Sequence, residues 1–232
     1  MAKKRLVVFT GAGVSAESGI STFRDAGGLW DKYPVMQVAS ADGFARDPAL
    51  VHQFYNMRRK ELLGVEPNAA HRAIAELEAT YDVDVITQNV DNLHERGGST
   101  RVLHLHGELM KVRSLRDESR IYELTEGNLM VDENSRDEYG DGLRPHIVFF
   151  QEDVPMFERA IELVRSCDIF LIIGTSLNVY PAAGLLVYPP KIAKIIYIDT
   201  NPAKVDWRAG IKVVAGKAAE IAPTIADLLA EE

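Results

Sequence analysis

The chain has 232 residues, of which 47% are hydrophobic and 26% charged, and its formal net charge at pH 7 is −8. This length suits one large α/β domain with an inserted module, and the acidic balance disfavours nucleic-acid binding, which needs a basic surface. No apolar run approaches the ~20 residues of a membrane span. Because an apolar strand begins soon after Met1, we expect no leader peptide, no membrane partner and a cytoplasmic location.

A glycine-rich loop follows the first predicted strand. Leu6–Phe9 is an apolar run typical of a buried strand, and Gly11 and Gly13 come directly after it. Glycines at a strand end let the backbone turn sharply and approach a phosphate closely. The dinucleotide fingerprint G-x-G-x-x-G is only partly met, because Ala16 replaces its third glycine, so a simple tight turn remains an alternative.

Several polar and aromatic side chains follow that loop. Ser15 offers a hydroxyl, and Arg24 offers a fork of donors that suits a phosphate or carboxylate. Trp30 and Tyr33 follow a second glycine-rich stretch, where they are either walls of a ligand site or simply buried.

Two helices are predicted next. Asp47-Pro48 is a typical helix start, with Asp as the N-cap and Pro in the first position, and Gly64 ends the segment. Tyr55 and Arg58 lie three residues apart on this helix and therefore share a face. A second helix is predicted to begin near Asn68.

A polar turn follows the next predicted strand, Val83–Thr87. Open α/β sheets place their ligands at the carboxyl ends of strands, and here Gln88, Asn89 and Asp91 offer amides and a carboxylate. An Asx-rich turn is the alternative. His106 ends a further short strand and is a plausible general base, because imidazole titrates near neutral pH. It is one of six histidines, so chemistry alone does not select it.

The second half contains three more predicted strands, His146–Phe150, Asp168–Ile173 and Lys194–Ile198, and a last helix from about Ala218. The single cysteine, Cys167, excludes an internal disulfide and is predicted to lie in the core. Strands that alternate with helices predict a doubly wound, mainly parallel sheet.

Five segments in chain order resemble the signatures of the sirtuins, which are NAD-dependent protein lysine deacylases. They are GAGVSAESGISTFRD from residue 11, TQNVDNLH from 87, HLHG from 104, LRPHIVFF from 143 and GTSL from 174. The resemblance spans most of the chain and implies a Rossmann-like large domain from about 1–30, 76–106 and 146–232. It implies a smaller domain built from insertions at about 31–75 and 107–145.

The resemblance also implies a reaction in which NAD is consumed. An acyl-lysine of a protein or peptide is deacylated, and nicotinamide and O-acyl-ADP-ribose are released, with His106 as general base and Asn89 and Asp91 positioning ribose and nicotinamide. Substrate would lie along Ile147, Val148, Phe149 and Phe150. The implied cofactor contacts are Gly11, Ala12, Gly13, Ser15, Phe23, Arg24, Trp30, Gln88, Asn89, Asp91, Gly174, Thr175, Ser176, Asp199, Thr200, Asn201 and Ala218.

The chain departs from the family pattern at several positions, among them Asp199, where many sirtuins have Asn. Most sirtuins carry a four-cysteine zinc module after the HLHG segment, but here Ser114 and Asp117 replace the first C-x-x-C pair, and no Cys or His lies between Glu108 and Arg144. We therefore predict a zinc-free module. Gln151 stands where the family has Gly. The apolar residues expected to hold the module are Leu115, Ile121, Tyr122, Leu124, Leu129 and Val131.

The Y-x-x-R pattern of Tyr55 and Arg58 resembles the desuccinylase and demalonylase subgroup, in which these side chains bind the acyl carboxylate. The alternative is that Tyr55 packs and Arg58 is a solvated charge. Other functions considered for the chain are an NAD dehydrogenase, an NAD-dependent mono-ADP-ribosyltransferase and a non-catalytic NAD-dependent binding module.

Overall fold

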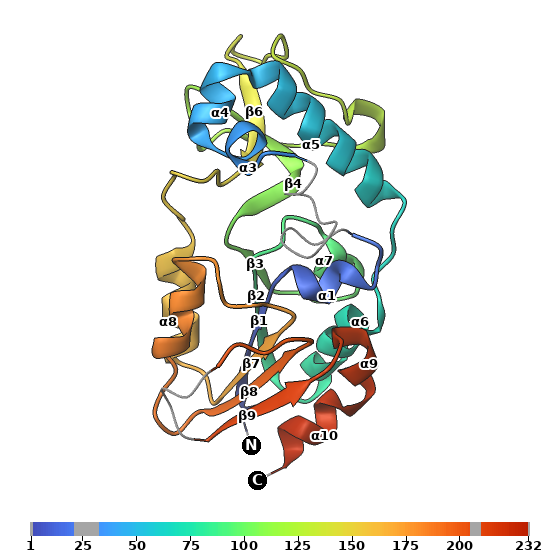
Figure 1. The fold of residues 1–232 in the computed structure, drawn as a ribbon, viewed down its shortest axis with the longest axis vertical. Coiled ribbons are helices and arrows are strands. Elements are labelled where there is room, and N and C mark those ends of the chain that lie inside the picture. Colours follow the sequence, from blue (N-terminus) through green and yellow to red (C-terminus); the bar gives the residue numbers. More distant parts are fainter. Residues whose placement is uncertain (1, 21–32, 205–209, 232) are drawn as a thin grey trace.

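The computed structural model describes residues 2–20, 33–204 and 210–231. A large domain surrounds a parallel sheet, and a smaller domain lies beyond the carboxyl ends of its strands (Figure 1). The six strands have the order β3-β2-β1-β7-β8-β9. The chain first adds β2 and β3 on one side of β1, and then β7, β8 and β9 on its other side. They are β1 (Arg5–Thr10), β2 (Asp82–Thr87), β3 (Val102–His104), β7 (Ile169–Ile173), β8 (Lys194–Asp199) and β9 (Ile211–Ala215).

This order is that of a doubly wound sheet, as predicted. All five strand pairs are parallel. The strand order reverses between β1 and β7, and such a switch point is where open α/β sheets bind their ligands. The glycine loop at the end of β1 therefore lies at the place in the sheet best suited to a ligand.

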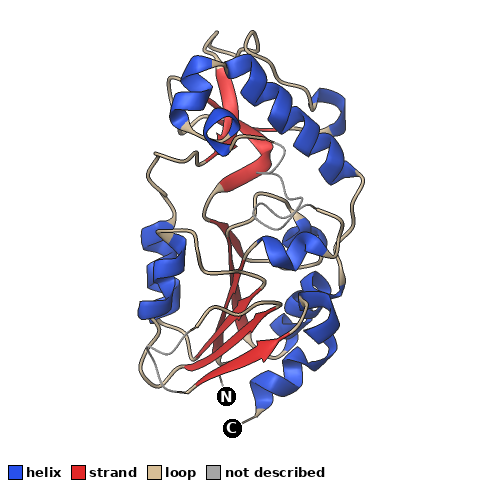
Figure 2. Ribbon diagram, in the orientation of Figure 1, coloured by secondary structure: helices blue, strands red, loops and turns tan. Residues whose placement is uncertain are grey.

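Helices cover both faces of the large sheet (Figure 2). One face carries α6 (Ala69–Glu76), which continues into the short turn η1 (Leu77–Ala79). The same face carries α9 (Ala218–Ile221) and α10 (Ile225–Ala230), which the short turn η4 (Ala222–Thr224) connects. The other carries α8 (Phe157–Arg165) and η3 (Ala182–Val187). At the carboxyl ends of the strands lie α1 (Ala12–Ala16) and α7 (Leu93–Arg96).

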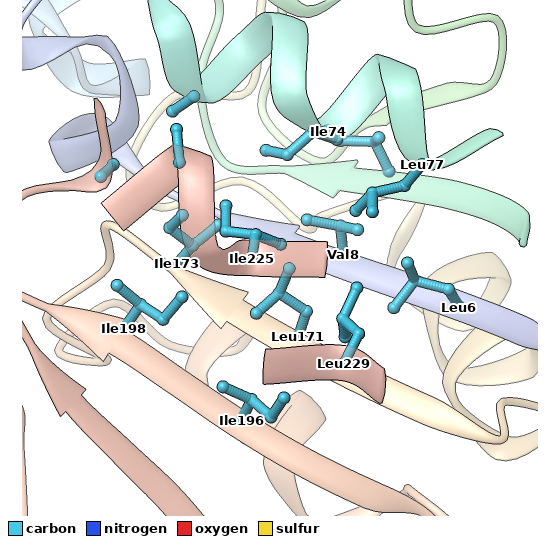
Figure 3. Packing of buried hydrophobic residues seen from close by; sticks show 14 of the residues in the cluster. Leu6, Val8, Ile74, Leu77, Leu171, Ile173, Ile196, Ile198, Ile225 and Leu229 are labelled. Atoms are coloured by element: carbon cyan, nitrogen blue, oxygen red, sulfur yellow. The ribbon is translucent and has the colours of Figure 1, made fainter. Parts of the chain in front are cut away.

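The core follows the two-residue period of the strands. Leu6 and Val8 of β1 point to the α6 and α10 side, where they join Leu171 of β7 (Figure 3). Val7 and Phe9 point to the α8 side. Full burial of such a side chain contributes about 1.5–3 kcal/mol, which explains why these strands are continuous apolar runs. Cys167 lies in the core on the α8 side of the sheet, as predicted.

Helix α6 lies with the large domain, whereas the expected domain division grouped it with the small domain. Ala70 packs on the large sheet, as do Ile74 and the following Leu77, which Figure 3 shows. Asn68 caps the helix, since its side chain accepts a hydrogen bond from the backbone N–H of Ala70 at 2.9 Å. The helix belongs with the large sheet because its apolar face has its partners there.

The small domain combines helices with an antiparallel sheet of order β5-β4-β6. Helix α5 begins after Asp47, whose carboxylate accepts from the Leu50 N–H at 2.9 Å, and ends at Gly64, as predicted. Phe54 of α5 packs with Leu109 and Phe149. The elements are α3 (Val35–Val38), α4 (Ala41–Arg46), α5 (Pro48–Leu63), β4 (Gly107–Ser114), β5 (Ile121–Glu123), η2 (Glu126–Asn128) and β6 (Leu143–Ile147). No described helix combines the length and the apolar character needed to cross a membrane.

The segment between β4 and β6 is held together differently from the prediction. Leu129 and Val131 are buried, but Leu115 is 53% and Ile121 44% exposed. The centre of the segment is the guanidinium of Arg120, which lies 2.8 Å from Asp137 and contacts Asp141. It also lies 4.5 Å from the centre of the Tyr139 ring. Charge therefore replaces part of the expected apolar packing.

Two further residues complete this Arg120 cluster. Arg120 donates to the Ser114 hydroxyl at 3.0 Å and lies 3.6 Å from the Asp117 carboxylate. These are the two positions at which the family resemblance places the first pair of zinc-binding cysteines. The guanidinium thus joins residues that a structural metal would otherwise join.

We expect the purified protein to carry no stoichiometric zinc. Structural zinc sites use thiolate and imidazole ligands, and the segment from Glu108 to Arg144 contains neither Cys nor His. Elemental analysis of dialysed protein tests this. About one zinc per chain, or a loss of activity on chelation, would contradict the prediction.

Candidate active site

A cavity of about 300 Å³ lies between the two domains at the carboxyl ends of the large-sheet strands. It brings together residues far apart in the sequence: the glycine loop, the turn after β2, His106, helix α5 and the chain after β6. The predicted site residues in its walls are Gly11, Ala12, Gly13, Tyr55, Arg58, Gln88, Asn89, His106, Ile147, Val148, Phe149, Phe150, Gly174, Thr175, Ser176, Asp199 and Thr200.

The remaining predicted residues divide into three groups. Ser15 and Asp91 are buried and hydrogen-bond to each other, and Ser15 also bonds to Asn89 in the cavity wall. Ala218 does not line the cavity, because α9 places it in the core beneath the large sheet. Asn201 is exposed and is likewise not among the wall residues. Phe23, Arg24 and Trp30 lie outside the described residues.

The glycines of the loop are required by close packing inside the protein. The Gly13 N–H donates to the Gly174 carbonyl at 2.9 Å, and a Cβ at Gly13 would lie 2.9 Å from the Gly174 Cα. A Cβ at Gly11 would lie 2.8 Å from the Thr175 Cβ. The sequence left two interpretations of this loop, a ligand-binding loop and a simple tight turn. They are compatible, because the tight turn that brings β1 and β7 together also exposes backbone at the cavity.

A buried hydrogen-bond network lies behind the loop. The Ser15 hydroxyl donates to Asp91 at 3.1 Å and accepts from the Asn89 side-chain amide at 3.0 Å. Burial raises the pKa of Asp91, while hydrogen bonds from the Leu93 N–H and Ser15 act in the opposite direction. The loop hydroxyl thus fixes both polar side chains that follow β2.

His71 is part of this network and was missed by the sequence analysis. Its Nδ1 accepts from the Asn68 N–H at 3.2 Å, which assigns the proton to Nε2, and Nε2 lies 3.4 Å from the Ser15 hydroxyl. Burial lowers the pKa of His71 to about 4, so the ring is neutral at pH 7. The sequence feature that could have identified His71 is its position three residues after the Asn68 cap, where its ring can face back toward the helix start.

His106 is held with one ring nitrogen toward the backbone. Its Nδ1–H donates to the Gln88 carbonyl at 3.0 Å, which leaves Nε2 as the acceptor. Burial lowers the pKa of His106, whereas the bond to Gln88 raises it, and the net direction is downward. The ring is therefore neutral at pH 7 and has the protonation state of a base.

The pKa of His106 predicts the acidic side of the pH–rate profile. A base works only when deprotonated, so a lowered pKa preserves activity until the pH falls through that lowered value. We expect the midpoint of the acidic limb of kcat/KM to lie below pH 6.5, the ordinary pKa of histidine. Initial rates measured across the acid range test this, and an acidic limb centred at or above pH 6.5 would contradict it.

Tyr55 and Arg58 both lie in the cavity wall, and both are buried. The Tyr55 ring packs against Phe149, with 5.9 Å between ring centres. Arg58 is only 7% exposed, with an Nη1 atom 3.4 Å from the Glu61 carboxylate. Burial lowers the pKa of Arg58, although Glu61 and Asp91 raise it. The alternative of a solvated surface charge at Arg58 is therefore wrong.

Comparison with known proteins shows the family to which the chain belongs. The family model described as "Sir2 family" matches residues 11–181. A protein from Bacteroides thetaiotaomicron named "NAD-dependent protein deacylase" is 56% identical over 231 residues, covering 97% of this chain and 98% of its own length. One with the same name from Helicobacter pylori strain J99 is 52% identical over 200 residues, covering 84% and 82% respectively.

Solved structures show the same fold in complexes with ADP ribose or NAD. A mutant Sir2 homologue in complex with ADP ribose superposes with a TM-score of 0.88 at 37% identity, covering 99% of this chain and 95% of its own. A Sir2 homologue–NAD complex gives 0.86 at 38% identity, covering 98% and 90%. The fold, the cavity and these relatives together place this chain in the Sir2 family, as an NAD-dependent protein deacylase.

Proposed function

We propose that this deacylase removes acyl groups that end in a carboxylate, succinyl or malonyl, from protein lysines. The observation that carries the proposal is the buried guanidinium of Arg58 beside Tyr55 in the cavity wall. A carboxylate moved out of water has to be paired, and a guanidinium offers it a charged fork of donors. The Tyr55 hydroxyl adds a neutral donor.

An acetyl group provides no comparable reason for Arg58 to lie in this wall. Acetyl-lysine ends in a methyl group, which apolar side chains alone can accommodate. Burying a guanidinium is costly unless it is paired and hydrogen-bonded. The Glu61 carboxylate at 3.4 Å is one partner, itself 54% exposed, and an acyl carboxylate in the cavity would pair with the guanidinium from the substrate side.

We propose the following roles for the residues around the reacting groups. Bound NAD would supply the ADP-ribose that accepts the acyl group. His106, neutral and with Nε2 as acceptor, would take a proton from a ribose hydroxyl as that hydroxyl attacks the acyl carbon. Asn89 and Asp91, fixed through Ser15, would orient ribose and nicotinamide.

A set of peptides that differ only in the acyl group tests the proposal. One sequence with succinyl-, malonyl- or acetyl-lysine is incubated with and without NAD, and mass spectrometry follows the free lysine peptide, nicotinamide and O-acyl-ADP-ribose. We expect NAD-dependent formation of all three products, with succinyl or malonyl preferred. A preference for acetyl-lysine would refute the carboxylate assignment, and label from NAD retained on protein would instead indicate mono-ADP-ribosyl transfer.

A further inference from the structure

A strained turn forms one wall of the cavity. The Phe149 carbonyl accepts from the Glu152 N–H at 3.1 Å, which closes a four-residue turn, and its third residue, Gln151, has φ of 79°. A turn with positive φ at this position normally carries Gly or Asn, because a side chain is disfavoured there. Gln151 thus occupies the position at which the family resemblance has Gly.

The Gln151 side chain makes two hydrogen bonds to one residue of the small domain. Its Nε2 donates to the Asp42 carboxylate at 2.8 Å, and its Oε1 accepts from the Asp42 backbone N–H at 3.2 Å. Asp42 lies in the first turn of α4. We call this pair of bonds the 42–151 clasp; it connects two segments separated by 109 residues in the sequence.

The backbone beside Gln151 is held by the same part of the small domain. The Phe150 N–H donates to the Ala39 carbonyl at 2.8 Å, and the Phe150 carbonyl accepts from the Ala41 N–H at 3.1 Å. On the other side of the turn, the Glu152 carboxylate accepts from the Phe149 N–H at 2.8 Å. The surroundings therefore fix the turn on both sides, which is the condition under which a strained residue persists.

All four residues of the turn, Phe149, Phe150, Gln151 and Glu152, line the cavity. Strained backbone gathers at ligand clamps, where a fixed shape is part of the function. We propose that Gln151 is a positioning residue for the polypeptide on either side of the acylated lysine, and that the 42–151 clasp holds this wall in the shape that the polypeptide contacts. The proposal rests on the deacylase cavity and is independent of the acyl preference.

The test compares substrates that differ only in length. One is a peptide of about eleven residues with an acyl-lysine at its centre, and the other is a single acyl-lysine with both ends blocked; both carry the acyl group that the wild-type protein removes fastest. For Gln151→Ala and Asp42→Ala, we expect KM for the peptide to rise about five- to twentyfold, as the loss of one or two hydrogen bonds allows. The kcat, and the KM for the single acyl-lysine, should stay within about twofold.

Two further variants separate the clasp from other effects. Asp42→Asn keeps a side-chain oxygen for the Gln151 amide and should behave like wild type. Gln151→Gly removes the clasp but adopts positive φ freely, so it should raise KM for the peptide as much as Gln151→Ala does. Because the two residues act as one pair, the double variant Gln151→Ala with Asp42→Ala should be no worse than either single one.

Three results would overturn the proposal. Gln151→Gly resembling wild type while Gln151→Ala is impaired would assign the effect to the backbone conformation. Equal changes for the peptide and the single acyl-lysine would show that the turn does not contact flanking polypeptide. Additive losses in the double variant would show that the two residues act separately. Melting curves for each variant exclude unfolding as the cause.

Discussion

Replacing His106 with alanine is expected to abolish deacylation while the fold stays intact. Proton transfer by a positioned side chain typically contributes 10²- to 10⁴-fold to an enzymatic rate, so kcat/KM should fall by at least about a hundredfold. The fold should survive because His106 lies in the cavity wall and its Nδ1 makes one hydrogen bond, to the Gln88 carbonyl. Steady-state rates and a thermal melt measure the two parts of this prediction.

His106→Asn is a matched control that tests whether His106 acts as a base or only holds Gln88 in position through a hydrogen bond. Asparagine can still donate to the Gln88 carbonyl but cannot act as a base near neutral pH. If His106 is the base, both variants are inactive, whereas if it only positions Gln88, the asparagine variant retains activity. Turnover above a few per cent of wild type in either variant would remove His106 from the role of general base.

Replacing Arg58 with methionine is expected to affect the removal of succinyl and acetyl groups differently. Hydrogen bonds to charged groups contribute roughly 1.5–3 kcal/mol each, so losing the guanidinium should lower kcat/KM for succinyl-lysine by about ten- to a hundredfold or more. The value for acetyl-lysine should hold or rise, since that substrate has no carboxylate to pair. Methionine is chosen because it is long and apolar and can fill most of the space of the arginine stem.

A matched control for this variant lies on α8. Arg159 pairs with Glu162 at 2.7 Å with the same three-residue spacing as Arg58 and Glu61, but Arg159 is 61% exposed and is not among the residues of the cavity walls. Arg159→Met should leave both substrates unchanged. If Arg58→Met lowers both substrates equally, Arg58 is structural and does not bind the acyl group.

Much of the large domain could be predicted because its signals are local. β7 is a continuous apolar run, and α5 has a capping Asp47 and a terminal Gly64. The site residues then meet for a general reason, since the carboxyl ends of parallel strands share one edge. β9 was missed because none of its residues is fully buried and Lys212 interrupts the apolar residues, so Ile211–Ala215 gives no continuous apolar signal. β6 was expected three residues later than it lies, because Phe149–Glu152 forms a turn where an extended strand was predicted.

What could not be predicted depends on contacts between distant residues. The 42–151 clasp joins two segments whose local sequences give no indication of each other. His71 and Ser15 are likewise 56 residues apart. In the small domain, hydrophobicity suggested Leu115 as a core residue, whereas the charges around Arg120 determine the packing. A pattern of single residues indicates which face is apolar, but not which polar groups will pair across the fold.

The Arg120 cluster has a consequence for the conditions that the small domain tolerates. A guanidinium is encoded with the fold, so it needs no metal delivery, and neither peroxide nor a chelator removes it. The Arg120 cluster is instead sensitive to low pH. Although burial acts in the opposite direction, hydrogen bonds and Arg120 hold the pKa of Asp137 below its usual range, so the ionised carboxylate stabilises the domain at neutral pH and this contribution is lost as the pH falls through that lowered pKa. If the small domain holds no zinc, as predicted, zinc shortage or oxidative stress would leave its packing unchanged, whereas strong acidification would weaken the Arg120 cluster.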